Sequence, residues 1–365
     1  METISSTKRD KKPKALIAMS GGVDSSMAAK LMQEAGYECI GCMMKLWDAN
    51  DDEQTPTRTC CSLDDAEDAR SVASRLGMPF YVFNFTKEFE NTIIADFVRS
   101  YENARTPNPC IECNRCMKFG KLYMRAQELG CDCVVTGHYA RIEKTGDRFV
   151  LKKALDESKD QSYVLYQLTQ EQLAHICFPL GKLKKDDVRE IAKGSGFVNF
   201  DKPDSQDICF VPDGNYAKVV EKYSGKAPTV GNFVDKNGRV LGRHKGLIHY
   251  TIGQRKGLGI SSDAPLYVLE LRIDTNEVVL GSNEDLFARE VMVARVNWIS
   301  GKTPEAPFRA KAKIRYRHKE QDAIIEPIGS DRARIIFEEP QRAVTPGQSA
   351  VIYDGDEVLG GGIIV

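Results

Sequence analysis

The first half of the chain alternates short apolar runs with longer amphipathic segments. Four apolar runs are typical of buried strands: 14–19, 37–47, 79–85 and 131–137. Four other segments have the periodicity and end signals of helices: 25–36, 63–77, 86–104 and about 115–129. Because the two kinds alternate, we expect an α/β domain with a parallel sheet covered by helices on both faces. Ligands of such sheets bind at the carboxyl ends of the strands.

The pattern changes after about residue 210, where glycine-containing segments alternate in polarity. Asn237-Gly238 and Thr275-Asn276 each separate two alternating runs, as the turn of a β-hairpin does. The last eighty or so residues are typical of a small β-barrel or sandwich. We therefore expect a flexible tail and three domains, namely a catalytic α/β domain, a small central domain and a C-terminal β-barrel. The expected limits are 1–13, 14–210, 211–284 and 285–365.

The composition is typical of a globular protein but does not indicate what the protein binds. Hydrophobic residues make up 42% and charged residues 28%, and the net charge is −1. No apolar run approaches the roughly 20 residues of a membrane span, and the polar, basic N-terminus is no secretory signal. We expect a cytoplasmic protein whose eleven cysteines serve as thiols, metal ligands or catalysts. A net charge near zero neither predicts nor excludes RNA binding, which depends on local patches.

A glycine loop follows the first predicted strand and precedes a helix, with the sequence Ser-Gly-Gly-Val-Asp-Ser at 20–25. Two glycines allow a tight turn whose backbone N–H groups approach an anion, and the helix N-terminus adds partial positive charge. Asp24 has the chemistry to hold Mg²⁺. The loop resembles the pyrophosphate loop of the PP-loop ATPases, which implies adenylation of a substrate oxygen by ATP. The implied nucleotide-binding residues are Ala18, Met19, Ser20, Gly21, Gly22, Val23, Asp24, Ser25, Met44 and Gly137. From the residues alone, core packing is the favoured interpretation of Met44 and Gly137, and the family resemblance adds the nucleotide role.

Cysteines occur in two segments that do not look like core strands. Cys110 and Cys113 follow Thr106-Pro107-Asn108-Pro109, whose prolines stiffen the loop, and Cys209 stands far along the chain in DSQDICF. We expect Cys113 to open the next helix, where the helix dipole favours a thiolate. Cys39, Cys42, Cys131, Cys133 and Cys177 are interpreted as core residues. For the adjacent pair Cys60-Cys61, a second metal or redox site is a weaker alternative.

Five segments together resemble the bacterial tRNA-specific 2-thiouridylases: TPNP..CN, TGHYAR (136–141), KDQSY (159–163), DSQDICF (204–210) and TIGQRKGLG (251–259). The resemblance spans roughly residues 14–350. It implies that ATP and Mg²⁺ serve to adenylate the 2-keto oxygen of the wobble uridine of tRNA. It also implies a persulfide on Cys209, loaded by a cysteine desulfurase or sulfur-relay protein, and a nucleophilic Cys113. The expected product is 2-thiouridine, and we expect a monomer.

One position departs from the family pattern. Better-studied members carry an aspartate where this chain has Cys110, and a thiol replaces a carboxylate poorly in proton transfer. Cys110, Cys113 and Cys209 could instead hold three irons of a [4Fe–4S] cluster, with Cys116 as a conceivable fourth ligand. Zinc is a minor option. The persulfide route and the cluster route therefore both stay open here.

The resemblance also implies a set of tRNA contacts, some of them to an unstacked target base. A basic alternating segment, 313–319, predicts a strand with its basic side chains on one face, although a merely solvated strand fits the pattern too. Basic residues between 239 and 256 are candidates for phosphate contacts. The implied tRNA-contacting residues are Asn108, Pro109, Cys110, His138, Lys159, Asp160, Gln161, Arg315, Tyr316 and Gln348.

Three other functions are compatible with some of these residues. A PP-loop synthetase with a small-molecule acceptor would leave Cys113 and Cys209 without a task. A cysteine-rich RNA-binding module without catalysis would leave the glycine loop at 20–25 without one. A PP-loop thiolase acting on another tRNA position fits both features, and locating the thiolated base would decide it. Pyrophosphate release that requires tRNA would separate the enzyme from the other two.

Overall fold

The computed structural model describes residues 12–47, 63–204, 208–211 and 213–365. The predicted tail at 1–13 lies almost entirely outside these residues, as do Cys60 and Cys61. No helix in the described part of the chain is long and apolar enough to cross a membrane.

The first domain is built on a five-stranded parallel sheet with the order β3-β2-β1-β4-β7. Its strands are β1 (Lys14–Ala18), β2 (Glu38–Lys45), β3 (Phe80–Asn84), β4 (Cys133–Val135) and β7 (Ile176–Cys177). The chain adds β2 and β3 on one side of β1 and then returns to add β4 on the other. The strand order therefore reverses between β1 and β4, which is where open α/β sheets bind ligands.

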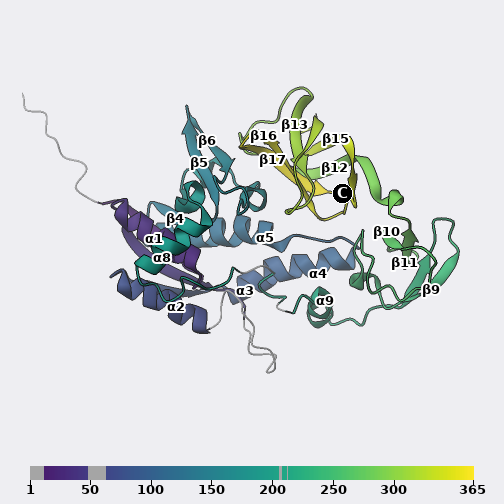
Figure 1. The fold of residues 1–365 in the computed structure, drawn as a ribbon, viewed down its shortest axis with the longest axis horizontal. Coiled ribbons are helices and arrows are strands. Elements are labelled where there is room, and N and C mark those ends of the chain that lie inside the picture. The colour runs from purple at the N-terminus through teal and green to yellow at the C-terminus, as the bar shows by residue number, and fades with distance from the viewer. Residues whose placement is uncertain (1–11, 48–62, 205–207, 212) are drawn as a thin grey trace, which may run out of the picture.

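Helices cover both faces of this sheet, as the alternating pattern predicted (Figure 1). One buried cluster packs the sheet against α1 (Val23–Glu34), α2 (Leu63–Arg75) and α8 (Lys185–Gly194). The other cluster lies against two long helical segments. The first comprises α3 (Thr86–Phe89), a π-turn (Glu90–Ile94) and α4 (Ala95–Glu102), and the second α5 (Pro109–Glu112), a π-helix (Cys113–Lys121) and α6 (Leu122–Glu128).

The second helical segment begins earlier than the sequence pattern suggested. Asn108 is its N-cap, and the Asn108 Oδ1 atom accepts a hydrogen bond from the backbone N–H of Cys110 at 3.2 Å. Pro109 stands at the first helical position, where its missing N–H costs nothing. The expectation that Cys113 opens the helix was therefore wrong. Cys110 lies in the first turn and Cys113 one turn further on, where the influence of the helix dipole has weakened.

A hairpin of β5 (Ala140–Thr145) and β6 (Arg148–Lys153) was not predicted from the sequence. It leaves the first domain and pairs with strand β17 of the barrel, so that one eight-stranded sheet joins the two. Short helices follow at Ser162–Leu165, α7 (Gln170–Leu173) and Pro179–Lys182. The hairpin stands beside the barrel in Figure 1.

The central part comprises α9 (Tyr216–Ser224) and a four-stranded sheet of order β10-β11-β8-β9. Both predicted hairpins are confirmed. β8 (Gly231–Val234) and β9 (Val240–His244) flank the Asn237-Gly238 turn, and β10 (Tyr267–Arg272) and β11 (Glu277–Gly281) flank the Thr275-Asn276 turn. A single helical turn lies at Leu247–His249.

The last domain is a closed barrel rather than a sandwich, because β12 pairs with both β15 and β17. After a short turn (Glu284–Leu286), its strands are β12 (Phe287–Trp298), β13 (Phe308–Lys313), β14 (Gln321–Ile328), β15 (Arg332–Arg342), β16 (Ser349–Asp354) and β17 (Glu357–Ile364). The strand predicted over 313–319 was wrong, because β13 ends at Lys313 and the chain then bends. The domain limits given above stay a prediction.

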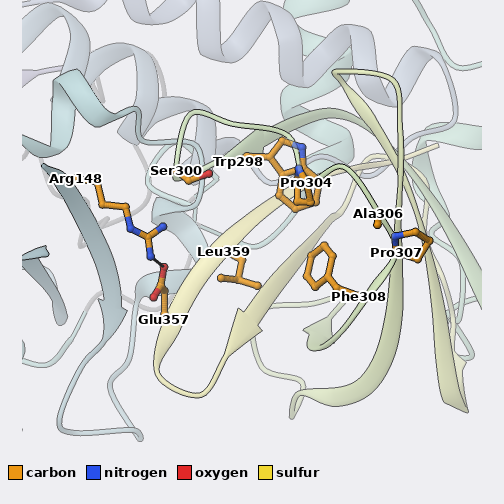
Figure 2. Close-up of a pocket in the computed structure, with 9 residues that line it drawn as sticks. All are labelled: Arg148, Trp298, Ser300, Pro304, Ala306, Pro307, Phe308, Glu357 and Leu359. Carbon is orange, nitrogen blue, oxygen red and sulfur yellow. Dashed lines mark hydrogen bonds and ion pairs between the residues drawn. The ribbon is translucent and has the colours of Figure 1, made fainter. Parts of the chain in front are cut away.

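A cavity of about 340 Å³ lies where the β5–β6 hairpin meets the barrel (Figure 2). Its apolar wall includes Trp298, Phe308 and Leu359, and an ion pair between Arg148 and Glu357 at 3.1 Å stands at one side. None of the residues that the sequence predicted for catalysis or binding lines it. The candidate site is therefore to be sought at the sheet.

Candidate functional site

The glycine loop lies directly after β1, at the point where the strand order reverses. Gly21 has a φ of +76°, and a Cβ atom there would lie 2.4 Å from the carbonyl oxygen of Asp65. Only glycine fits such a position. Gly22 is the N-cap of α1, and the Ser25 hydroxyl donates to the Gly22 carbonyl at 3.0 Å while it accepts from the Ser20 N–H at 3.1 Å. The hydroxyl thereby fixes the turn that presents the helix N-terminus.

Gly137 joins this loop from the neighbouring strand. It follows β4, and a Cβ atom on it would lie 2.7 Å from the backbone carbon of Asp24 and 2.8 Å from the Ser25 nitrogen. The two glycine-containing segments, far apart in the sequence, are therefore in direct backbone contact. Met44, on the adjacent strand β2, is buried in the core cluster on the other side of the sheet. The geometry leaves room at the strand ends only while both glycines are kept.

A segment that the sequence did not single out supports the loop from outside. The buried Asn199 side chain donates through Nδ2 to the Gly21 carbonyl at 2.8 Å and to the Ser26 hydroxyl at 3.0 Å. Lys202 binds Asp65 and Asp68 of α2, both at 2.6 Å. These contacts pin the loop to α2, and no local motif around residue 200 indicated them.

Asp24, the predicted magnesium ligand, already has protein partners. The Tyr139 hydroxyl donates to its Oδ1 atom at 2.8 Å, and the Lys185 ammonium binds both carboxylate oxygens at 2.7 Å. The carboxylate is part-exposed and sits in the first turn of α1. The oxygen donor and its place beside the glycine loop suit a Mg²⁺ ion that accompanies ATP phosphates.

The loop that precedes Cys110 is held at Thr106 by contacts from the two other domains. The Thr106 N–H donates to the Pro346 carbonyl at 2.9 Å, and Gln348 Nε2 donates to the Thr106 carbonyl at 2.8 Å. The Thr106 hydroxyl donates to that of Thr251, in the central domain, at 3.4 Å. Both backbone groups of Thr106 are thus used by the barrel, so the loop takes its shape from a partner more than 200 residues away in the sequence.

The two predicted catalytic cysteines both contact the larger core cluster of the first domain. Cys113 is buried in the core cluster beneath the sheet, and Cys209 packs against that cluster half-buried. Phe210, next to Cys209, packs edge-on against Phe89 and Phe97, with ring centroids 5.6 and 5.1 Å apart. Cys110 is exposed at the start of its helix. No disulfide joins any two of the nine cysteines in the described part of the chain.

Five further cysteines are core residues or nearly so, as predicted. Cys39, Cys42, Cys131 and Cys133 are buried, and Cys177 is half-buried. Burial raises the pKa of the Cys39 thiol to about 11 and that of Cys42 further. The thiols of Cys39 and Cys42 are therefore protonated and poorly reactive at neutral pH.

The nine cysteines within the described ranges do not form a metal site in this conformation. Among the described residues, no three His, Cys, Asp or Glu side chains are grouped closely enough to hold a metal ion. Cys110 is exposed whereas Cys113 is buried, and the thiol of Cys116 donates weakly to Glu112 at 3.9 Å. The donor set that a cluster would need is present in the sequence but is not assembled.

Several residues with predicted tRNA contacts are engaged with the protein itself. Asp160 accepts hydrogen bonds from Ala154 and Ser162, and Gln161 accepts one from the Tyr139 N–H at 3.0 Å. Lys159 forms an ion pair with Asp204 at 2.8 Å. These contacts shape the segment that follows the β5–β6 hairpin.

His138 is buried at the end of β4, between the rings of Phe119 and Phe178, and it bonds the Thr136 hydroxyl at 2.7 Å. Burial holds the pKa of His138 well below its ordinary 6.5. The imidazole is therefore neutral at physiological pH. Its contact with tRNA stays a prediction.

The basic segment after β13 does not present one charged face. Lys313 is buried over the rings of Tyr163 and Tyr353. Arg315 Nη2 donates to the Thr345 hydroxyl at 2.8 Å and to the Ala343 carbonyl at 3.0 Å. The guanidinium therefore braces the loop that holds Thr106.

Tyr316 is an exposed member of this segment. Its hydroxyl donates to the Asp160 carbonyl at 3.2 Å. Burial of the hydroxyl, and after it the charge of Asp160, raises the pKa of Tyr316. The barrel therefore brings Tyr316 against Asp160, and both belong to the predicted tRNA-contacting residues.

Comparison with known proteins gives matches along nearly the whole chain. Three family models match: a tRNA methyl transferase HUP domain at 13–213, a tRNA methyl transferase PRC-barrel domain at 217–282 and an aminomethyltransferase β-barrel domain at 288–364. The tRNA-specific 2-thiouridylase MnmA of Clostridioides difficile is 52% identical over 354 residues, which are 96% of this chain and 98% of the relative.

Other relatives agree. The tRNA-specific 2-thiouridylase MnmA of Acetivibrio thermocellus is 49% identical over 97% of this chain and 99% of its own length, and that of Geotalea uraniireducens is 49% identical over 98% and 96%. The family models speak of methyl transfer, whereas these relatives are thiouridylases; identity near 50% along both whole chains is the more specific finding. Among solved structures, an NMN synthetase from Francisella tularensis matches at 18% identity with a TM-score of 0.33, over 60% of this chain and 80% of that one, which is too low to carry an argument.

Proposed function

Because this chain belongs to the family of tRNA-specific 2-thiouridylases, we propose that it is a tRNA-uridine 2-sulfurtransferase acting on the wobble uridine. It consumes ATP and yields 2-thiouridine, AMP and pyrophosphate. The observation that carries the proposal is the placement of a glycine loop at the strand-order reversal of the same domain whose core contains Cys113 and contacts Cys209. A phosphate site and two thiols in one domain fit activation followed by sulfur transfer.

In the first step, the glycine loop binds the phosphates of ATP. The 2-keto oxygen of the uridine attacks the α-phosphorus, the bond to the β-phosphate breaks, and pyrophosphate leaves. Asp24 would hold the Mg²⁺ ion that accompanies ATP, and that ion would supply positive charge for the phosphate oxygens. The backbone N–H groups at the start of α1 supply the remaining donors. The proposed nucleotide-binding residues are Ala18, Met19, Ser20, Gly21, Gly22, Val23, Asp24, Ser25, Met44 and Gly137.

In the second step, Cys209 carries the sulfur as a persulfide. Its terminal sulfur attacks C2 of the adenylated base, and AMP leaves with the former keto oxygen. The Cys113 thiolate then attacks the Cys209 sulfur, so that the S–S bond breaks, the transferred sulfur stays on C2 and a Cys113–Cys209 disulfide forms. A cellular thiol reductant restores both thiols. Alternatively, Cys113 attacks the persulfide first and releases hydrosulfide, which attacks C2 itself.

The target base and its tRNA are held along the face where the barrel meets the first domain. The exposed ring of Tyr316 supports this, since an aromatic ring is a ready stacking partner for an unstacked base. The fixed loop before Cys110 supports it too, because base recognition needs rigid partners. The proposed contacts are Asn108, Pro109, Cys110, His138, Lys159, Asp160, Gln161, Arg315, Tyr316 and Gln348.

The partners and setting follow from the same reaction. A cysteine desulfurase or a sulfur-relay protein loads Cys209, and the enzyme works as a cytoplasmic monomer on the anticodon stem-loop. The lack of a membrane-spanning helix among the described residues is consistent with that setting. We also propose 14–210, 211–284 and 285–365 as the limits of the three domains.

A [4Fe–4S] cluster on Cys110, Cys113 and Cys209 is the less favoured alternative, because the three thiols are not grouped for a metal. Anaerobic purification with iron analysis tests it. We expect no stoichiometric iron and full turnover from a persulfide donor. Iron that is present in stoichiometric amount and needed for turnover would replace the persulfide route with the cluster route. Cys110→Asp sharpens the test, since activity should survive on the persulfide route.

The central experiment compares Cys209→Ser with Cys131→Ser, a buried thiol with no proposed role. The Cys209→Ser variant should still release pyrophosphate in a tRNA-dependent reaction but form no thiolated base. The Cys131→Ser variant should do both. Digestion of the tRNA and mass spectrometry of its nucleosides measure the product. Normal thiolation by Cys209→Ser, or thiolation at a position other than the wobble uridine, would overturn the proposal.

A further inference from the structure

One buried ammonium group connects two segments to which the reaction steps assign different tasks. Lys185 is the first residue of α8 and is 5% exposed. It binds both carboxylate oxygens of Asp24, in the glycine loop, at 2.7 Å. It also forms an ion pair with Asp204 at 2.8 Å. Two carboxylates that share one ammonium lie close together, and without the cation they would repel each other.

Asp204 is held from more than one side. Lys159 binds its second oxygen at 2.8 Å, and Arg189 lies 3.5 Å from the first. Burial opposes the charge, yet Lys159 and Lys185 bring the pKa of Asp204 down to about 2. The carboxylate is therefore ionised at any physiological pH, and its ion pairs are permanent features of the folded chain.

Asp204 is the last residue before the segment that carries Cys209. Five residues span at most about 17 Å even when fully extended, so an anchored Asp204 limits where Cys209 can go. At the other end, Phe210 is buried between Phe89 and Phe97. The thiol is thus confined between an ionic anchor beside the glycine loop and an aromatic anchor in the core.

We propose that Lys185 is a positioning residue for sulfur transfer, which ties the Cys209 segment to the glycine loop through Asp24 and Asp204. This inference rests on the proposed function, since it assigns Cys209 the sulfur and Asp24 the nucleotide side. Lys185 touches neither thiol. It acts by holding the Asp24 and Asp204 carboxylates close together, and with them the glycine loop and the start of the Cys209 segment.

The first test is hydrogen–deuterium exchange of the full chain, without ATP or tRNA. Lys185→Met and Asp204→Asn should each raise the exchange rate of the peptide covering 208–211 at least threefold, and Lys185→Arg should restore most of the protection. Lys184→Met is the matched control, because Lys184 is exposed, adjacent and forms no ion pair within the described residues. Unchanged exchange in Asp204→Asn would overturn the proposal, as would an equal rise in the control.

The second test separates the two steps of the reaction. In Lys185→Met and Asp204→Asn, the yield of thiolated tRNA per pyrophosphate released should fall at least tenfold. An equal fall in both products would show that Lys185 serves the nucleotide alone, and would overturn the proposal. If the wild-type chain makes no 2-thiouridine, the proposed function fails, whereas the exchange result still stands or falls by itself. Circular dichroism confirms that each variant is folded.

Discussion

The glycine loop and the loop before Cys110 reach a fixed shape by opposite means. The glycine loop comes from six consecutive residues, and its geometry depends on a strand, a left-handed glycine and a helix N-terminus within one domain. The Thr106–Cys110 loop depends more on distant partners, although Asn108 caps its helix locally. Its backbone is bonded by Pro346 and Gln348 from the barrel, and its hydroxyl by Thr251 from the central domain. We call the glycine loop a local site and the Thr106–Cys110 loop a distributed site. Adding one atom to the local site should cause a large loss of activity, whereas removing one contact from the distributed site should cause a small one.

Gly21→Ala should produce the largest effect, because it adds a Cβ atom 2.4 Å from the Asp65 carbonyl oxygen at a φ of +76°. We expect tRNA-dependent pyrophosphate release to fall by about 100-fold or more, since both a clash and a strain of about 1–3 kcal/mol must be relieved. Gly36→Ala is the control, with φ +89° but nothing within 4 Å of the added atom. Similar losses in the two variants would mean that backbone strain alone decides, and that the loop is not sterically matched to Asp65.

Arg315→Met should come next and should act on the distributed site. Its guanidinium binds Thr345 and Ala343, and hydrogen bonds of charged groups contribute about 1.5–3 kcal/mol. We expect a lower apparent melting temperature together with weaker tRNA turnover, while binding of a non-hydrolysable ATP analogue is kept. If turnover falls but the melting temperature does not, Arg315 serves tRNA alone and the barrel loop does not need it.

The stability of the folded chain should depend on pH through His138, which follows Gly137 and so belongs to the glycine-loop region. The folded pKa of His138 lies well below 6.5, so on acidification through about 6.5 the unfolded chain takes up a proton that the folded chain refuses. Stability should therefore fall below pH 6.5, by up to about 1.4 kcal/mol per pH unit for this group. Thermal melts of the wild type and His138→Gln between pH 7.5 and 5.5 measure it. The variant should lose less stability over that range; an identical loss would assign the effect to the other histidines.

Gln348→Ala should have the smallest effect, because it removes a single hydrogen bond to the Thr106 carbonyl. A net contribution of about 1 kcal/mol predicts a roughly fivefold fall in kcat/KM for tRNA. ATP-analogue binding should not change. A fall of 100-fold would show that the distributed site is as brittle as the glycine loop, and the contrast between the two would be lost.

The sequence predicted most of what arises locally. Apolar runs located the parallel sheet, Asn237-Gly238 marked a hairpin turn, and the residues at 20–25 indicated a glycine turn at the start of a helix, because each depends on neighbours within a few positions. The alternation at 313–319 misled, since the chain bends after Lys313. Arg315 and Tyr316 there turn to partners at 345 and 160, which periodicity cannot reveal.

The same limit explains what was missed at the site. Lys185 stands in an ordinary helix-starting segment, and only the fold shows that it lies between Asp24 and Asp204. Asn199 likewise has no local signal, although it holds the Gly21 carbonyl. The start of the Cys110 helix could have been predicted, because Asn108-Pro109 is a capping residue followed by proline at the first helical position.

The Thr106 junction has a consequence for the newborn chain. Gln348 lies 242 positions after Thr106 in the sequence. Until the ribosome has made that part of the chain, the backbone N–H and C=O of Thr106 lack their eventual partners. The sheet and its glycine loop can mature meanwhile, since their contacts are complete much earlier in synthesis. The loop that precedes Cys110 therefore takes its final shape only after the end of the barrel has been synthesised.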